Sequence, residues 1–155
     1  TASSLLEEIA RRNPELLREV AVIDFNPQVN RELRVRGLHV VYGDISQRDT
    51  LLQAGVDQAE VVLCTIPNSL LKGVTNARLV RQVREINPAA RIIAPADTFP
   101  DVPRLYAAGA DFVIVPRLVE AKHLCEILQA AREGQLADLR HETDRDLKDR
   151  KEVLP

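Results

Sequence analysis

The sequence contains no Met and no Trp, and aromatic residues make up only 3% of its 155 positions. A core built from this chain must therefore be aliphatic. No apolar run approaches the roughly 18 residues of a membrane span, and the N-terminus lacks the pattern of a signal peptide, so we expect a soluble, cytoplasmic domain. The net charge of −2, with both signs interspersed, gives no general attraction for nucleic acid.

Residues that could perform catalysis or bind metal are few. Cys64 and Cys125 lie far apart without the spacing of a metal site, and we expect both to be buried, reduced thiols. The histidines at 39, 123 and 141 complete no Ser-His-Asp order, and no paired carboxylate motif accompanies them. We therefore expect a protein that is not an enzyme.

Hydrophobic periodicity predicts strands and helices that alternate along the chain. The expected strands are 21–25, 39–42, 60–66, 91–94 and 112–115. The expected helices are 3–20 with a weak point at Asn13-Pro14, 27–37 after an Asn26 cap, a short one capped by Ser46 and ending at Gly55, 69–86, 100–108 and 117–132. This order predicts an α/β fold with a doubly wound parallel sheet, whose apolar strands are covered on both faces.

Asp24 stands at the carboxyl end of the first expected strand, where ligands of such sheets bind. A carboxylate there can accept hydrogen bonds from the two ribose hydroxyls of a dinucleotide, and its alternative role is to cap the next turn. The accompanying G-x-G-x-x-G loop should lie about 20 residues earlier, yet the first glycine is Gly37. We expect the chain to be a fragment that begins inside the first helix of a nucleotide-binding unit.

That fragment would lack the first strand of the sheet. In the order 3-2-1-4-5-6 this strand lies in the middle, so its absence leaves a slot of about 9–10 Å between the strands that end at Asp24 and at Ile66. Three remedies are open: preceding residues omitted from this chain, direct pairing of the two strands, or a strand donated by another copy. We favour the first, which an intact mass above 17.3 kDa would support.

The order of several motifs resembles the RCK or TrkA-N (KTN) family. The resemblance covers about residues 3–132 and rests on VIDFNPQ, LRVRGLHVVYGDISQRDTLLQAGVDQAEVVLCTIPN, TNARLVRQVREINPAARIIA and YAAGADFVIVP. It implies a Rossmann-like fold that binds NAD(H), AMP, ADP or ATP. It also implies homodimers or higher rings that regulate a potassium channel, a potassium transporter or a Kef-type cation/proton antiporter from the cytoplasmic face of the membrane.

The resemblance also implies a set of binding residues. They fall in three groups, for the ribose, the adenine and the part of the nucleotide beside the phosphate loop: Asp24, Phe25 and Asn26; Gly43, Asp44 and Ile45; and Cys64, Thr65, Ile66 and Pro67. Local alternatives stay open, because Tyr-Gly-Asp is also an ordinary turn and Thr65 could bond to backbone. For Asn68 and Asn76 we favour a structural role over ligand contact.

Two departures from the family bear on the ligand. Many relatives carry an Arg after the IIA strand, whereas Pro95 and Asp97 stand here, which disfavours a phosphate-rich ligand such as ATP. The missing glycine loop removes the backbone N–H groups that hold the pyrophosphate, so this chain carries an adenosine half-site at most.

The C-terminal part is divided into an apolar helix and a charged segment. Helix 117–132 carries more apolar residues than a solvated helix needs; some pack on the sheet, and we read the excess as a homodimer surface. We place the family-like domain at 1–134 and treat 135–155 as a solvated helix or a disordered tail, with contact to a membrane partner as the less favoured idea. The alternatives to a regulatory domain are a fragment of an NAD-dependent oxidoreductase and a ligand-free assembly module.

Overall fold

The computed structural model describes residues 2–148, 150 and 151. The chain forms two compact units, one up to Ile114 and one from Val115. The end of the family-like domain at residue 134 stays a prediction.

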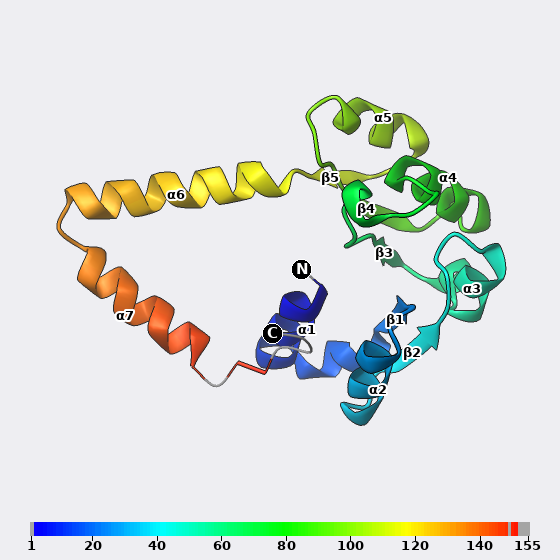
Figure 1. The fold of residues 1–155 in the computed structure, drawn as a ribbon, viewed down its shortest axis with the longest axis horizontal. Helices are drawn as coiled ribbons and strands as arrows, with labels where there is room; N and C mark the ends of the chain where they lie inside the picture. The colour runs from blue at the N-terminus through cyan, green and yellow to red at the C-terminus, as the bar shows by residue number, and fades with distance from the viewer. Residues whose placement is uncertain (1, 149, 152–155) are drawn as a thin grey trace. The chain divides into compact units, whose positions relative to one another are not determined.

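The first unit begins with two parallel strands and the helices that cover them (Figure 1). In chain order these elements are α1 (Ala2–Arg12), the 3₁₀ helix η1 (Pro14–Glu19), β1 (Ala21–Asp24), α2 (Pro27–Val35) and β2 (His39–Tyr42). The expected weak point at Asn13-Pro14 is where α1 ends and η1 begins. A small core forms where Leu33 of α2 packs with Leu38 and Val40, against apolar side chains that include Leu6 and Leu17.

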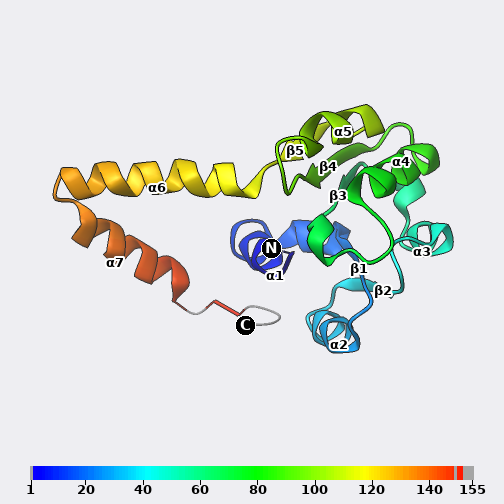
Figure 2. The ribbon, with the colours of Figure 1, turned by 45° about the horizontal axis from the view of Figure 1, so that its top comes forward.

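Three further parallel strands complete the unit. The elements are α3 (Arg48–Gln53), η2 (Val56–Gln58), β3 (Val61–Leu63), η3 (Asn68–Leu70), α4 (Asn76–Ile86), β4 (Arg91–Pro95), α5 (Asp101–Ala108) and β5 (Phe112–Ile114). Figures 1 and 2 show α4 and α5 against the sheet, where α4 contacts β4 and α5 contacts β5. Val80, Ile92 and Leu105 are at most 1% exposed, so this is the better-packed part of the unit.

The strands form two sheets, of order β1-β2 and β3-β4-β5. The parallel α/β class is confirmed, and the order within each sheet agrees with the expected 3-2-1-4-5-6 once strand 1 is left out. Among the described residues no hydrogen bonds join β1 to β3, so direct pairing of these two strands, one of the three remedies, is wrong. Val61 and Leu63 of β3 are 50% and 40% exposed, which contradicts the prediction that this strand is covered on both faces.

Three expected elements differ in detail. Ser46 does not cap α3, because its backbone N–H donates to Asp44 and the residue before the helix is Gln47. The expected helix 69–86 is interrupted at Gly73, which has a left-handed φ of 74°, and α4 starts only after the Thr75 cap. The expected strand 60–66 is hydrogen-bonded as a strand only over residues 61–63, because the chain then turns toward the start of α4.

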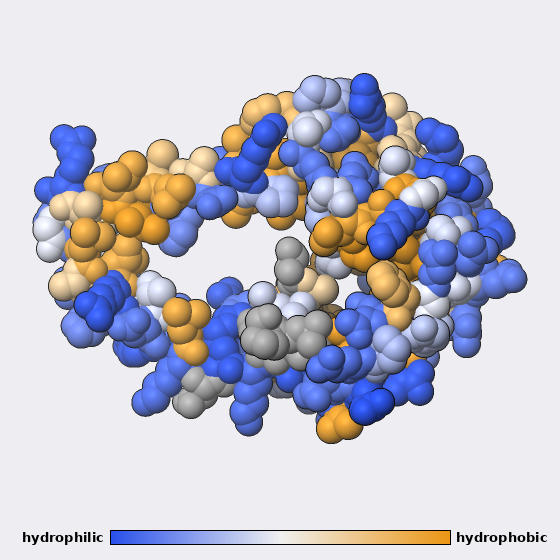
Figure 3. Space-filling model, in the orientation of Figure 1, coloured by the Kyte–Doolittle hydropathy of each residue, from blue (hydrophilic) through white to orange (hydrophobic). Residues whose placement is uncertain are grey.

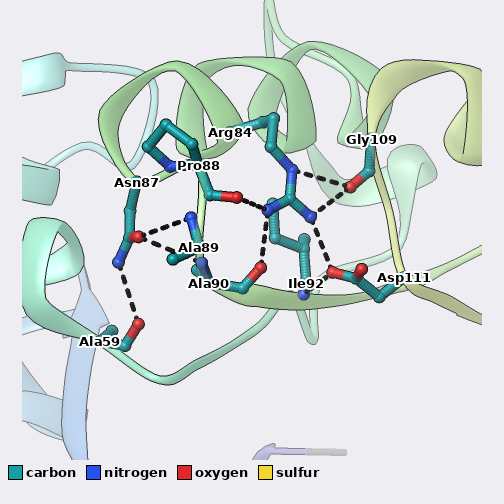
Figure 4. Close-up of polar contacts among 9 residues, drawn as sticks. All are labelled: Ala59, Arg84, Asn87, Pro88, Ala89, Ala90, Ile92, Gly109 and Asp111. Carbon is teal, nitrogen blue, oxygen red and sulfur yellow. Dashed lines mark hydrogen bonds and ion pairs between the residues drawn. The ribbon is translucent and has the colours of Figure 1, made fainter.

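Arg84 connects α4 to the segments that precede β4 and β5 (Figure 4). Its guanidinium donates to the backbone oxygens of Pro88 and Ala90, both at 2.7 Å, and to that of Gly109 at 2.8 Å. It also reaches Asp111 Oδ2 at 2.7 Å. One side chain on α4 therefore satisfies carbonyl groups before β4 and between α5 and β5.

Asp111 continues this network into the sheet. Its Oδ2 accepts the backbone N–H of Ile92 at 2.7 Å as well as the bond from Arg84. The Ile92 N–H, and to a lesser degree Arg84, hold the pKa of Asp111 below its ordinary value of 3.8, although partial desolvation opposes them. Asn87 closes the end of α4 in the same region by accepting from the N–H groups of Ala89 and Ala90.

The second unit consists of α6 (Pro116–Arg132) and α7 (Leu136–Leu147), joined by a turn at Gly134. The expected helix 117–132 is confirmed, and the first charged residues after it form a solvated helix. Residues 149 and 152–155 of the predicted tail lie outside the described residues. Among the described residues, none of the helices has the length and apolar character needed to cross a bilayer.

The side chains of α6 are largely exposed. Figure 3 shows apolar surface over the C-terminal part of α6 and the start of α7, where Leu124 is 51%, Leu128 65% and Leu136 47% exposed. Cys64 is half-buried and Cys125 is exposed, so the prediction that both thiols are buried is wrong. Helix α6 places Cys125 on a side that its own unit does not cover.

Candidate functional site

The carboxyl ends of β1 and β2 bring the first two groups of candidate residues together. Asp24 pairs with Tyr42 in the ladder, and the N–H of Gly43 donates to the Asp24 carbonyl oxygen at 3.4 Å. Asp24 Oδ1 accepts the backbone N–H of Asn26 at 2.7 Å, so this acid does hold the next turn. Its Oδ2 accepts no hydrogen bond from the described residues, which leaves one carboxylate oxygen available to a ligand.

Asn26 and Asn30 build the rest of this corner. Asn26 Oδ1 caps α2 by accepting from the N–H groups of Gln28 and Val29, as predicted. Asn30, only 6% exposed, donates from Nδ2 to the carbonyl oxygens of Asp24 and Asn26, and its Oδ1 is buried without a partner. Sequence reasoning missed Asn30; its position four residues after a cap, on the buried side of a helix, is the signal that could have identified it.

Gly43 and Asp44 form a tight turn after β2. A Cβ on Gly43 would lie 2.7 Å from Thr50 Cγ2, so contact with α3 already requires glycine here. Asp44 Oδ1 accepts the backbone N–H of Ser46 at 2.8 Å, and this bond, with the Ser46 side chain, lowers the pKa of Asp44 from its ordinary 3.8. The ordinary-turn alternative is therefore present in the geometry.

The apolar candidates beside these acids differ in exposure. Phe25 is 68% exposed at the end of β1, whereas Ile45 is half-buried. The exposed Phe25 ring is a surface on which a flat base can stack.

The third group follows β3. The N–H of Cys64 donates to Ile93, and Asn76 Nδ2 donates to the Ile66 carbonyl oxygen at 2.8 Å. The N–H of Asn76 in turn donates to Asn68 Oδ1, so the structural role favoured for both asparagines is confirmed. Burial raises the pKa of the Cys64 thiol to about 11, which makes it a poor nucleophile.

Thr65 and Asp97 define the polar character of this loop. The Thr65 hydroxyl forms no hydrogen bond with the described residues, so bonding to backbone, its alternative role, is not observed. Asp97 Oδ2 accepts the backbone N–H of Ser69 at 3.1 Å and places a negative charge here. Within the described residues, no hydrogen bond joins this loop to Asp24 or Asp44. The described residues also contain no cluster of His, Cys, Asp and Glu that could hold a metal ion.

These residues fit the adenosine part of a nucleotide better than its phosphates. Asp24 offers a free acceptor for ribose hydroxyls, and the next residue, Phe25, has an exposed aromatic ring. Asp97, which accepts the Ser69 N–H in the loop after β3, adds a negative charge there that is unfavourable for phosphates.

Comparisons with known proteins identify the family of this chain. The sequence model of the TrkA-N domain matches residues 1–116. The glutathione-regulated potassium-efflux system protein KefC of Escherichia coli O139:H28 is 34% identical over 93 residues, which are 60% of this chain and 14% of KefC. The chain therefore spans only a small part of that relative.

Solved structures extend the comparison to the fold. The TrkA-N domain of the inner membrane protein YbaL from Escherichia coli matches with a TM-score of 0.70 and 27% identity, over 81% of this chain and 87% of that one. The GsuK RCK domain matches with a TM-score of 0.57 and 35% identity, over 74% and 23%. GsuK has also been solved bound to NAD and to ADP, with TM-scores of 0.57 and 0.54. The chain belongs to the TrkA-N domain family and has its Rossmann-like fold.

Proposed function

We propose that this chain is a nucleotide-binding regulatory domain of a potassium transporter, a potassium channel or a Kef-type cation/proton antiporter. The observation that carries the proposal is the free Oδ2 of Asp24 at the carboxyl end of β1, one residue before the exposed Phe25. The transport role is supported by the similarity to KefC, a potassium-efflux system protein. The ligand is NAD(H) or another adenine nucleotide, because GsuK has been solved with NAD and with ADP. The role is binding, without turnover.

Each group of candidate residues has a separate task in this proposal. Asp24 Oδ2 accepts from the ribose hydroxyls while Oδ1 keeps the turn in place. Asp44 and the backbone at Gly43 and Ile45 face the adenine. Thr65, whose hydroxyl is uncommitted among the described residues, donates to a phosphate or ribose oxygen.

A further strand between β1 and β3 would complete the site. Both strands present an open edge there, since each pairs on one side only, and Val61 and Leu63 are left exposed. We propose that a strand followed by a glycine-rich loop occupies this position and supplies the phosphate-binding N–H groups. Such a strand would also cover the two exposed side chains of β3.

Regulation requires that the ligand distinguish two arrangements of paired domains. The exposed apolar residues of α6, among them Leu124 and Leu128, are proposed as the surface that joins two copies at the cytoplasmic side of a membrane partner. If the nucleotide binds one arrangement of the pair more tightly, it shifts the population toward that arrangement and biases the gate. An L124E/L128E variant should lower the fraction of dimer measured by analytical ultracentrifugation.

Calorimetric titration of NAD⁺, NADH, AMP and ATP tests the binding step. It should be made on this chain and on a version extended at its N-terminus by a strand and a Gly-x-Gly-x-x-Gly segment. The decisive variant is Asp24→Asn, because its amide oxygen can still accept the Asn26 N–H while a donor replaces the free oxygen. We expect affinity to fall at least about tenfold, the loss of one charge-assisted hydrogen bond. The control Asp57→Asn changes an exposed acid bonded only to Gln58.

The same titration separates the alternatives. Equal affinity of the Asp24→Asn variant and the parent chain would contradict the ribose role. Absence of binding by both versions would favour the assembly module. Reduction of NAD⁺ in the presence of simple alcohols would favour the oxidoreductase fragment.

A further inference from the structure

A polar groove lies between α3 and α4, and none of the candidate nucleotide residues lines it. Its volume is about 320 Å³. Six residues line it: Ser46, Arg48, Arg78, Arg81, Gln82 and Glu85. We call this surface the arginine groove. Its size is at the lower end of the range for small-molecule sites, and its lining contains no aromatic ring on which a base could stack.

The charge of the arginine groove is unbalanced. Three guanidinium groups face one carboxylate, Glu85, whereas the chain as a whole carries a net charge of −2. Arg81 and Glu85 are four residues apart on α4, a spacing that often forms an ion pair, yet no such pair is present. Within the described residues, the guanidinium groups of Arg48 and Arg78 form no hydrogen bond or ion pair; Arg78 donates only through its backbone N–H, to Thr75 Oγ1.

The guanidinium groups of the arginine groove differ in this from those of seven other arginines. These pair with a carboxylate within 3.7 Å: Arg11, Arg12, Arg18, Arg36, Arg84, Arg104 and Arg140. Three guanidinium groups that gather around one hollow without protein partners leave their N–H donors to a ligand. Guanidinium donors match the oxygens of carboxylates and phosphates in geometry and charge.

We propose that the arginine groove binds a small multivalent oxyanion, a molecule that carries two or more phosphate or carboxylate groups. Three guanidinium groups can engage two such groups at once, which a single chloride or acetate ion could not exploit. Glu85 limits the affinity by repelling the anion from one wall.

The arginine groove shares one turn with the candidate nucleotide site. Gln82 Nε2 donates to the Ser46 carbonyl oxygen at 3.3 Å, and the Ser46 N–H donates to Asp44 Oδ1. An anion that moves Gln82 or Ser46 would therefore act on the turn that holds Asp44. This consequence rests on the proposed nucleotide binding, whereas anion binding itself does not.

Calorimetric titration of pyrophosphate and of citrate into the full chain tests the proposal, at 50 and 200 mM NaCl. We expect binding of at least one probe, weaker at the higher salt. R78Q/R81Q should lower the affinity at least tenfold, and E85Q should raise it at least twofold. R31Q removes an exposed arginine on α2 and should stay within twofold of the parent. Thermal unfolding of each variant should show that the fold is retained.

The two probes and one further variant decide the remaining points. Binding of pyrophosphate alone assigns a phosphate ligand, binding of citrate alone a carboxylate ligand, and binding of both a general polyanion site. The Asp24→Asn variant should bind pyrophosphate as the parent does, even if it fails to bind nucleotide, so the two proposals fail separately. Absence of binding at 50 mM NaCl, equal affinity of R31Q and R78Q/R81Q, or loss of pyrophosphate binding in Asp24→Asn alone would overturn the proposal.

Discussion

Replacement of Arg84 by Ala should be among the most destabilising single changes on the surface of α4. The side chain forms four hydrogen bonds of 2.7–2.8 Å, three to backbone oxygens and one to Asp111. At about 1.5–3 kcal/mol for each charged hydrogen bond, their simple sum would exceed 6 kcal/mol. Arg84 is 27% exposed, however, so water can reach most of the vacated acceptors. Only Ala90, 2% exposed, would keep a carbonyl oxygen shielded from solvent, and we expect a net loss of about 2–3 kcal/mol.

Most of this loss should come from the carbonyl groups and little from the ion pair. Asp111 is 51% exposed, and exposed pairs contribute at most about 1 kcal/mol. A double-mutant cycle of Arg84→Ala with Asp111→Asn, followed by urea unfolding, measures the share of the pair. Asn at 111 can still accept the Ile92 N–H, so the cycle isolates the charge.

Arg104 on α5 provides the control for this experiment. It lies 3.6 Å from Asp101 and is 74% exposed, so Arg104→Ala should change the free energy of unfolding by less than about 0.5 kcal/mol. A cost of Arg84→Ala below about 1 kcal/mol, or a coupling energy that accounts for most of the cost, would refute the reasoning.

Three other predictions follow from single contacts. The pKa of Asp111 is lower in the folded state than its unfolded value of 3.8. The ionised carboxylate therefore stabilises the fold above pH 3.8, and this stabilisation is lost as the pH falls through the folded-state pKa. The difference in free energy of unfolding between the parent chain and Asp111→Asn, measured in urea, should narrow in that acidic range. Gly43→Ala should cost about 1–3 kcal/mol through overlap with Thr50, and Thr50→Ala in the same chain should recover part of this loss. At pH 8 a maleimide should label the exposed Cys125 rapidly and the half-buried Cys64, with its pKa of about 11, slowly; equal rates would contradict the raised pKa of Cys64.

Much of the fold could be predicted because the signals that start and end its helices are local in sequence. Asn26-Pro27 begins α2, and Asn87-Pro88 ends α4, as their cap chemistry requires. The alternation of apolar strands and amphipathic helices was sufficient to predict the parallel sheets. These signals act over a few residues, so tertiary context did not override them.

The errors fall where distant groups decide the local structure. The chain leaves β3 after Leu63 because Asn76, more than ten residues later, holds the Ile66 carbonyl oxygen. The run of apolar residues alone predicted that the strand would continue to residue 66. The Arg84 network escaped prediction for the same reason, since the carbonyl oxygen of Gly109 and the carboxylate of Asp111 lie far along the chain.

In the candidate site, one oxygen of a carboxylate can hold a turn while the other stays available to a ligand. Asp24 and Asp44 each use Oδ1 to accept a backbone N–H two residues ahead, which is the turn-forming role considered as the alternative for each. This bond does not exclude a ligand, because it fixes the orientation of the carboxylate and lowers the entropy that binding must remove. At Asp24 the other oxygen has no partner among the described residues. Replacement of Asp24 by Ala would therefore remove the turn contact and the ligand contact together. Replacement by Asn keeps the turn contact and tests the ligand contact alone.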